Sequence, residues 1–113
     1  MAVEAAESKK ALDVVTLDMH QITLFTDYFV IGSGTSTVHV KAIAEAVEEK
    51  LSGAGVRLLH REGVNGGRWV LLDYGDVVVH IFHQDEREYY DLERFWRGAP
   101  RVNFDRLRER SGT

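Results

Sequence analysis

Three short patterns in this sequence have residue types that could carry chemistry. The first, Gly32-Ser33-Gly34, stands where a strand is expected to meet a helix, and backbone N–H groups at such a place can hold a phosphate. Thr37 stands where a dinucleotide-binding loop would have its third glycine, and the Gly-Lys-Ser/Thr ending of a phosphate-binding loop is absent from the sequence. A plain strand-to-helix turn is the simpler interpretation, because glycine is common at such turns.

Carboxylates and histidines form the other two patterns. Asp73 and Asp76 flank an expected hairpin turn, where two carboxylates without a third ligand hold Mg²⁺ poorly and usually serve the turn itself. His80 and His83 are three residues apart, which points them to opposite faces of a strand. The sequence has no cysteine, so thiolate nucleophiles and disulfides are excluded. We predict that the protein is not an enzyme and has no catalytic residue, metal site or cofactor.

Length and composition indicate the number of domains, the location and the class of partner. The 113 residues suit one domain, so we expect a single domain over residues 1–113, with an ordered core at about residues 5–103 and frayed termini. The N-terminal residues contain no apolar run of the kind found in signal peptides and membrane spans, which favours a cytoplasmic protein without a membrane partner. A formal net charge of −4 disfavours sequence-specific nucleic-acid binding and favours a basic protein as partner.

Hydrophobic periodicity predicts an α/β fold, with one mixed sheet of about five strands flanked by helices. The middle helix connects two strands in a β-α-β unit, so those two strands should be parallel. The expected elements are a helix over Ala5–Asp13, a strand over Val14–Met19, a strand over Tyr28–Ile31 broken by Gly32-Ser33-Gly34, a helix capped by Thr35 or Ser36 and ending near Gly53, strands over Val56–Glu62, Arg68–Asp73 and Asp76–Phe82, and a helix capped by Asp85 that carries Tyr89, Leu92 and Trp96 on one stripe.

The hairpin around Tyr74-Gly75 is the most informative feature. If these two residues form its loop, Asp73 pairs with Asp76 and Trp69 pairs with His80. One face is then purely aliphatic and suited to packing under helices: Val70, Leu72, Val77, Val79 and Ile81. The other face carries Trp69, Leu71, Asp73, Asp76, Val78 and His80. An apolar anchor with a charged margin is typical of a protein-binding patch, so we predict that these residues and Tyr74 bind a partner. The alternatives are that a helix of the same chain, or a second copy, covers this face.

The run from Trp69 to His80 resembles the signature of the ribosomal silencing factor family, also called the Iojap-related proteins. The resemblance extends from about Leu12 to Pro100, although members commonly carry Arg where this chain has Val38. Further matching pieces are Asp27–Ile31, Gly34-Thr35-Ser36, His39-Val40, Glu62-Gly63, Arg87–Glu93, Trp96 and Ala99-Pro100.

The resemblance implies a fold and a function. The fold would be a mixed sheet flanked by helices, related to nucleotidyltransferases but without their catalytic acids. The protein would be a homodimer when free, and it would bind the large ribosomal subunit through that subunit's fourteenth protein. Bound there, it would block joining with the small subunit and repress translation when nutrients are scarce, with Trp69 corresponding to the family's contact tryptophan. A nucleotidyltransferase-like enzyme and a plain homodimeric adaptor are the alternatives.

Overall fold

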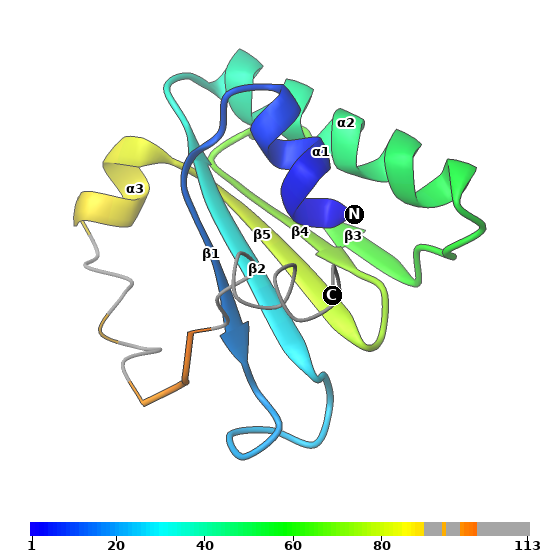
Figure 1. Ribbon diagram of the computed structural model, residues 1–113. Coiled ribbons are helices and arrows are strands. Elements are labelled where there is room, and N and C mark those ends of the chain that lie inside the picture. The colour runs from blue at the N-terminus through cyan, green and yellow to red at the C-terminus, as the bar shows by residue number, and fades with distance from the viewer. Residues whose placement is uncertain (90–93, 95–97, 102–113) are drawn as a thin grey trace, which may run out of the picture.

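A computed structural model describes residues 1–89, 94 and 98–101 of the chain. It contains one mixed sheet of five strands in the order β1-β2-β5-β4-β3, and α1 and α2 lie together on one face of that sheet (Figure 1). This confirms the predicted fold class. The elements are α1 (Ala2–Ser8), β1 (Leu12–Asp18), β2 (Tyr28–Gly34), α2 (Thr37–Gly53), β3 (His60–Glu62), β4 (Trp69–Asp73), β5 (Val77–His83) and α3 (Gln84–Tyr89).

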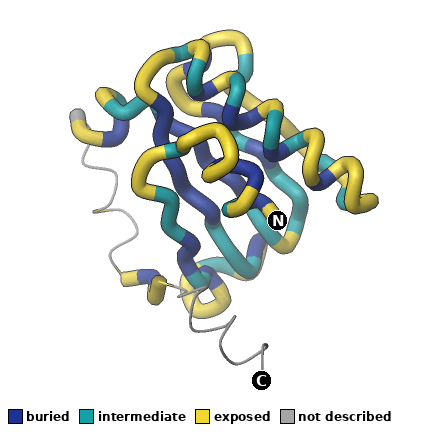
Figure 2. The backbone as a smooth tube through the Cα atoms, turned by 45° about the horizontal axis from the view of Figure 1, so that its top comes forward, coloured by how far each residue is buried: buried dark blue, intermediate teal, exposed yellow. Residues whose placement is uncertain are grey.

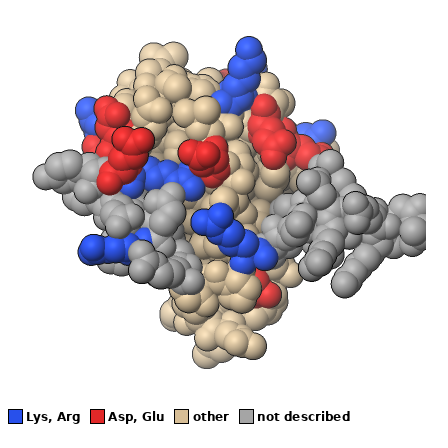
Figure 3. Space-filling model, turned by 60° about the vertical axis from the view of Figure 1, so that its left-hand side comes forward, with Lys and Arg blue, Asp and Glu red and all other residues tan. Residues whose placement is uncertain are grey.

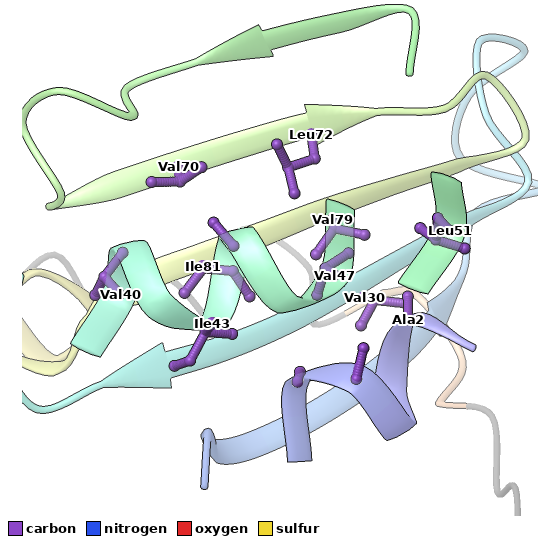
Figure 4. Packing of buried hydrophobic residues seen from close by; sticks show 13 residues of the cluster. Ala2, Val30, Val40, Ile43, Val47, Leu51, Val70, Leu72, Val79 and Ile81 are labelled. Atoms are coloured by element: carbon purple, nitrogen blue, oxygen red, sulfur yellow. The ribbon is translucent and has the colours of Figure 1, made fainter. Parts of the chain in front are cut away.

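The main core lies between α2 and the sheet. Ser36 caps α2 as predicted, since its side-chain oxygen accepts a hydrogen bond from the backbone N–H of His39 at 3.0 Å. Four apolar side chains of α2 recur at helical spacing and are buried against the aliphatic face of β4 and β5 (Figure 4). These residues are Val40, Ile43, Val47 and Leu51 on the helix, and Val70, Leu72, Val79 and Ile81 on the strands. The face assignments of the two strands are therefore confirmed.

Strand pairing differs from the simple β-α-β expectation. β2 and β3 do run in the same direction, but β5 and β4 lie between them. β2 instead pairs in parallel with β5, whereas β1, β4 and β3 pair antiparallel to their neighbours. The expected strand Val56–Glu62 shrinks to the edge strand β3, because the N–H of Val56 bonds to the carbonyl of Leu51 and helps to end α2.

The glycines after Ile31 do not break the strand. β2 continues through Gly34, which still pairs with His83 of β5. A Cβ atom on Gly34 would lie 2.9 Å from the backbone nitrogen of Val40, so this position needs glycine because the first turn of α2 crosses the strand closely. The prediction of a break at Gly32-Ser33-Gly34 is therefore wrong.

The terminal elements also differ from expectation. α1 covers Ala2–Ser8 instead of Ala5–Asp13, and its buried alanines pack on the main core. The described part of α3 ends at Tyr89, so Leu92 and Trp96 of the expected helical stripe lie outside the described residues. Among the described residues, no helix is long and apolar enough to cross a membrane.

Candidate protein-binding surface

The β4–β5 hairpin has a wider turn than the sequence suggested. Trp69 pairs with Phe82, Leu71 with His80 and Asp73 with Val78. The expected pairs of Trp69 with His80 and of Asp73 with Asp76 are therefore wrong. The face of each residue is nevertheless unchanged, because the partner strand has shifted by two residues and side chains alternate with that period.

The turn itself explains the shift. The carboxylate of Asp73 accepts a hydrogen bond from the N–H of Gly75 at 2.8 Å, and Gly75 has a φ of 89°, which favours glycine. The N–H of Tyr74 then bonds to the carbonyl of Val77 at 2.9 Å and closes the loop around Asp76. Asp73 thus serves as a turn former, as the sequence indicated.

Four aromatic rings gather on the sheet face that points away from α1 and α2. The rings of Phe29 and His80 are 4.6 Å apart, and those of Trp69 and Phe82 are 4.9 Å apart. The imidazole of His80 stacks on Phe82 with an interplanar angle of 5°. Phe82 is fully buried and was missed as a neighbour of Trp69. The alternation of β5 could have revealed it, since residues 78, 80 and 82 must share one face.

Trp69 and His80 form a hydrogen-bonded pair. The indole N–H of Trp69 donates to Nδ1 of His80 at 3.1 Å, so that nitrogen accepts and cannot carry a proton. His80 is 5% exposed, and its burial lowers the pKa of its imidazole to about 4. The prediction that His80 lies exposed beside Trp69 is corrected: it is a buried neutral ring that holds the indole in place.

The exposed part of this face lies over β4 and the edge strand β3. Trp69 is 47% exposed, and Leu71, Asp73 and Val78 are partly exposed around it. Beside them on β3, His60 pairs with Asp73 and Glu62 pairs with Leu71 in the strand register. We call this set the hairpin surface: Trp69, Leu71, Asp73 and Val78, with His60 and Glu62 at its edge.

The other half of the same face, over β1 and β2, is largely buried, with Val15 and Phe29 partly exposed. Ile31 and Leu17 pack there in a second cluster with Ala99. The backbone N–H of Asp18 donates to the carbonyl of Pro100 at 2.8 Å, so a segment from the end of the chain lies beside β1. In Figure 2, buried residues run along the strands of the sheet, whereas exposed residues are frequent in the connecting loops and along the outer side of the helices. A segment of the same chain thus covers part of the β1 side, but its described residues 98–101 are not the helix that the alternative expected.

Tyr74 and Asp76 lie away from the hairpin surface. Tyr74 packs against the main core on the α2 side, and burial raises the pKa of its hydroxyl, with the carboxylate of Glu48 adding to the effect. Asp76 is exposed in the turn, and its carbonyl accepts hydrogen bonds from the N–H groups of Asp27 and Tyr28. The predicted set of seven partner-binding residues is therefore divided between two faces and a turn.

The other residues whose types could carry chemistry have structural roles. Ser33 accepts a hydrogen bond from the buried guanidinium of Arg87 at 2.9 Å. His83, not Asp85, caps α3, because its Nδ1 accepts the backbone N–H of Asp85 at 3.1 Å. Within the described residues, no group of three or more His, Asp or Glu side chains is arranged to hold a metal ion.

Comparison with known proteins agrees with this architecture. A family model described as "Ribosomal silencing factor during starvation" matches residues 1–113. Ribosomal silencing factor RsfS of Bacillus subtilis is 45% identical over 105 residues, which cover 93% of this chain and 89% of that protein. A crystal structure from Chromobacterium violaceum aligns with a TM-score of 0.82 at 40% identity, over 90% of this chain and 84% of that one. A mouse protein named "Mitochondrial assembly of ribosomal large subunit protein 1" is 32% identical, over 85% of this chain and 43% of that protein. This chain therefore belongs to the ribosomal silencing factor family.

Proposed function

We propose that the protein binds the large ribosomal subunit through the hairpin surface, with the subunit's fourteenth protein as the contact, and that it thereby blocks joining with the small subunit. The observation that carries this proposal is the half-exposed indole of Trp69, fixed on the rigid sheet by His80. The name of the mouse relative links a family member to the large subunit and supports the same partner.

The chemistry of the hairpin surface suits a basic protein. Trp69 offers a large ring that is already ordered, so burying it in an interface costs little conformational entropy. Asp73 and Glu62 supply carboxylates beside it, and the whole chain has a formal net charge of −4. Complementary charge speeds and orients docking onto a basic ribosomal protein. Such a block works by occupying space and involves no catalysis.

A free homodimer would use the same surface. One small domain offers few apolar patches, and Leu71, Val78 and Trp69 form a partly exposed apolar patch on the described part of the sheet. Dimerisation and partner binding should then compete. Light scattering of a mixture with the purified ribosomal protein should show heterodimers replacing homodimers, and a ternary species that retained the homodimer would contradict this sharing.

Co-sedimentation with separated ribosomal subunits tests the proposal. The wild-type protein should pellet with the large subunit and not with the small one, and it should reduce the joined ribosomes in a sucrose gradient. Trp69→Ala should weaken large-subunit binding by roughly 2–4 kcal/mol, the range typical of a central interface anchor. Val38→Ala is the matched control, because Val38 is 75% exposed on α2 and outside the hairpin surface. Unchanged gradients with excess wild-type protein would refute the proposal.

Two experiments separate the alternatives. A plain homodimeric adaptor would sediment with neither subunit. A nucleotidyltransferase-like enzyme would bind nucleotide in the presence of magnesium, which a calorimetric titration would detect. Association with the large subunit also fits the expected cytoplasmic location, which stays a prediction.

A further inference from the structure

The loop between β1 and β2, residues 19–27, presents apolar side chains to solvent at one end of the molecule (Figure 1). Leu24 is 100% exposed and Phe25 is 93% exposed, and Ile22 beside them is also exposed. Met19, at the base of the same loop, is buried in the second cluster. The three exposed side chains thus point into solvent, although the second cluster lies at the base of their own loop. In Figure 3 the lowest part of the molecule is a lobe without charged side chains.

Hydrogen bonds at the base of the loop hold this tip in place. The N–H of Met19 donates to the carbonyl of Asp27 at 2.8 Å and ties the two ends of the loop together. The carbonyl of Met19 accepts from the N–H groups of Ile22 and Thr23, both at 3.0 Å. The hydroxyl of Thr23 in turn accepts from the N–H of Phe25 at 3.1 Å. The loop is therefore a compact, internally bonded unit, which reduces the entropy lost when its tip is bound.

Several charged residues lie near the base of the tip. The imidazole of His20 bridges the carboxylates of Asp18, at 2.5 Å, and Asp27, at 3.3 Å. The backbone of the β4–β5 turn is bonded to the loop through the carbonyl of Asp76, whose side chain makes no ion pair among the described residues. Arg101 lies on the β1 side through its bridge to Leu17. Among the described residues near this base, three carboxylates thus outnumber the one permanent cation.

The apolar tip and the carboxylates near its base together limit the kind of molecule that could bind here. RNA and anionic membranes would bring negative charge toward Asp18, Asp27 and Asp76, and a second copy docked tip to tip would do the same. A protein segment with an apolar pocket and basic side chains at its rim fits both the tip and the carboxylates near its base. The turn at Asp76 also belongs to the hairpin whose other residues form the hairpin surface, so one hairpin connects the two contact regions.

We infer that the loop tip of Leu24 and Phe25 is a second docking element, which inserts into an apolar pocket of a basic protein on the large ribosomal subunit. The inference rests on the proposed function, and it adds a contact at the opposite end of β5 from Trp69. In this arrangement the hairpin surface and the loop tip fix the orientation of the bound chain at two separated points.

A double variant, Leu24→Ser with Phe25→Ser, tests this contact. Because both side chains are exposed, the variant should unfold in urea like the wild type. Its affinity for the large subunit in quantitative co-sedimentation should fall tenfold or more. Val38→Ser is the matched control, since it replaces an exposed apolar side chain in the first turn of α2, which follows the end of β2 opposite the loop, and it should bind like the wild type. Equal affinity of the double variant and the wild type would overturn the inference and leave the proposed function intact.

A photo-reactive phenylalanine analogue at position 25 identifies the occupant. Crosslinking to a basic protein of the large subunit supports the inference. Crosslinking to ribosomal RNA or to a second copy of the chain overturns it. A wild-type protein that fails to associate with the large subunit refutes the proposed function and this inference together, so the two failures are distinguishable.

Discussion

Acidification should destabilise the fold through His80. Its pKa is lowered by burial from 6.5 to about 4, and its Nδ1 must stay unprotonated to accept the indole N–H of Trp69. Between these two pKa values the unfolded chain binds a proton that the folded chain excludes. The contribution of His80 to stability is therefore complete above pH 6.5 and is lost as the pH falls toward 4.

The size of the effect follows from the shift. Each pKa unit corresponds to about 1.36 kcal/mol, so a shift of roughly 2.5 units is worth about 3 kcal/mol once the pH has fallen to 4. At pH 5 the loss should be about 2 kcal/mol relative to pH 8. Measurements above pH 5 largely avoid the titration of surface carboxylates, whose usual pKa values lie near 4.

Urea unfolding at pH 8 and pH 5 measures this loss, with His80→Asn as the reference variant. Asparagine places an oxygen near the position of Nδ1, so it can still accept the indole N–H, but it does not titrate. His20 is present in both proteins. Its effect on stability at low pH has the opposite sign, because its bond to Asp18 raises the pKa of its imidazole. The difference between the two proteins therefore isolates His80. Equal losses in both, or an NMR titration of His80 near pH 6.5, would refute the reasoning.

Three substitutions provide further tests. Trp69→Ala should lower the free energy of unfolding by roughly 2–3 kcal/mol, measured in urea, because about half of the indole is buried in the fold; an unaltered midpoint would mean that the ring packs on nothing. Gly63→Ala should cost about 1–3 kcal/mol for its φ of 77° alone, and the new Cβ would lie against the carbonyl of Trp69, so a loss of large-subunit binding in co-sedimentation should accompany the loss of stability. Arg87→Met should lower stability by about 2–4 kcal/mol in thermal unfolding, since Arg87 is buried and donates to the carbonyl of Asp13 and the hydroxyl of Ser33; wild-type stability would show that these bonds contribute nothing.

Local sequence patterns were sufficient for the order of the main helices and strands, but not for all of their bounds, and for the face on which each residue of β4 and β5 lies. The stripe at Val40 and Val47 predicts the buried side of α2, and the alternation from Val77 to Ile81 predicts the aliphatic side of β5. Both patterns repeat within a few residues, so they report local geometry directly. Even the wrong register kept Trp69 and His80 on one face, because it differed by two residues, a whole period of the strand.

Tertiary structure alone decided which of these faces remain exposed. The sequence placed His80 in an exposed patch, but packing on Phe82 and Phe29 buries it and makes it a support for Trp69. Ile31 is likewise covered, by contacts that involve Ala99. Burial depends on partners that are distant along the chain, and no local period encodes them. The exposed tip of the β1–β2 loop was missed for the same reason, since an apolar residue in a sequence does not show whether the fold will bury it.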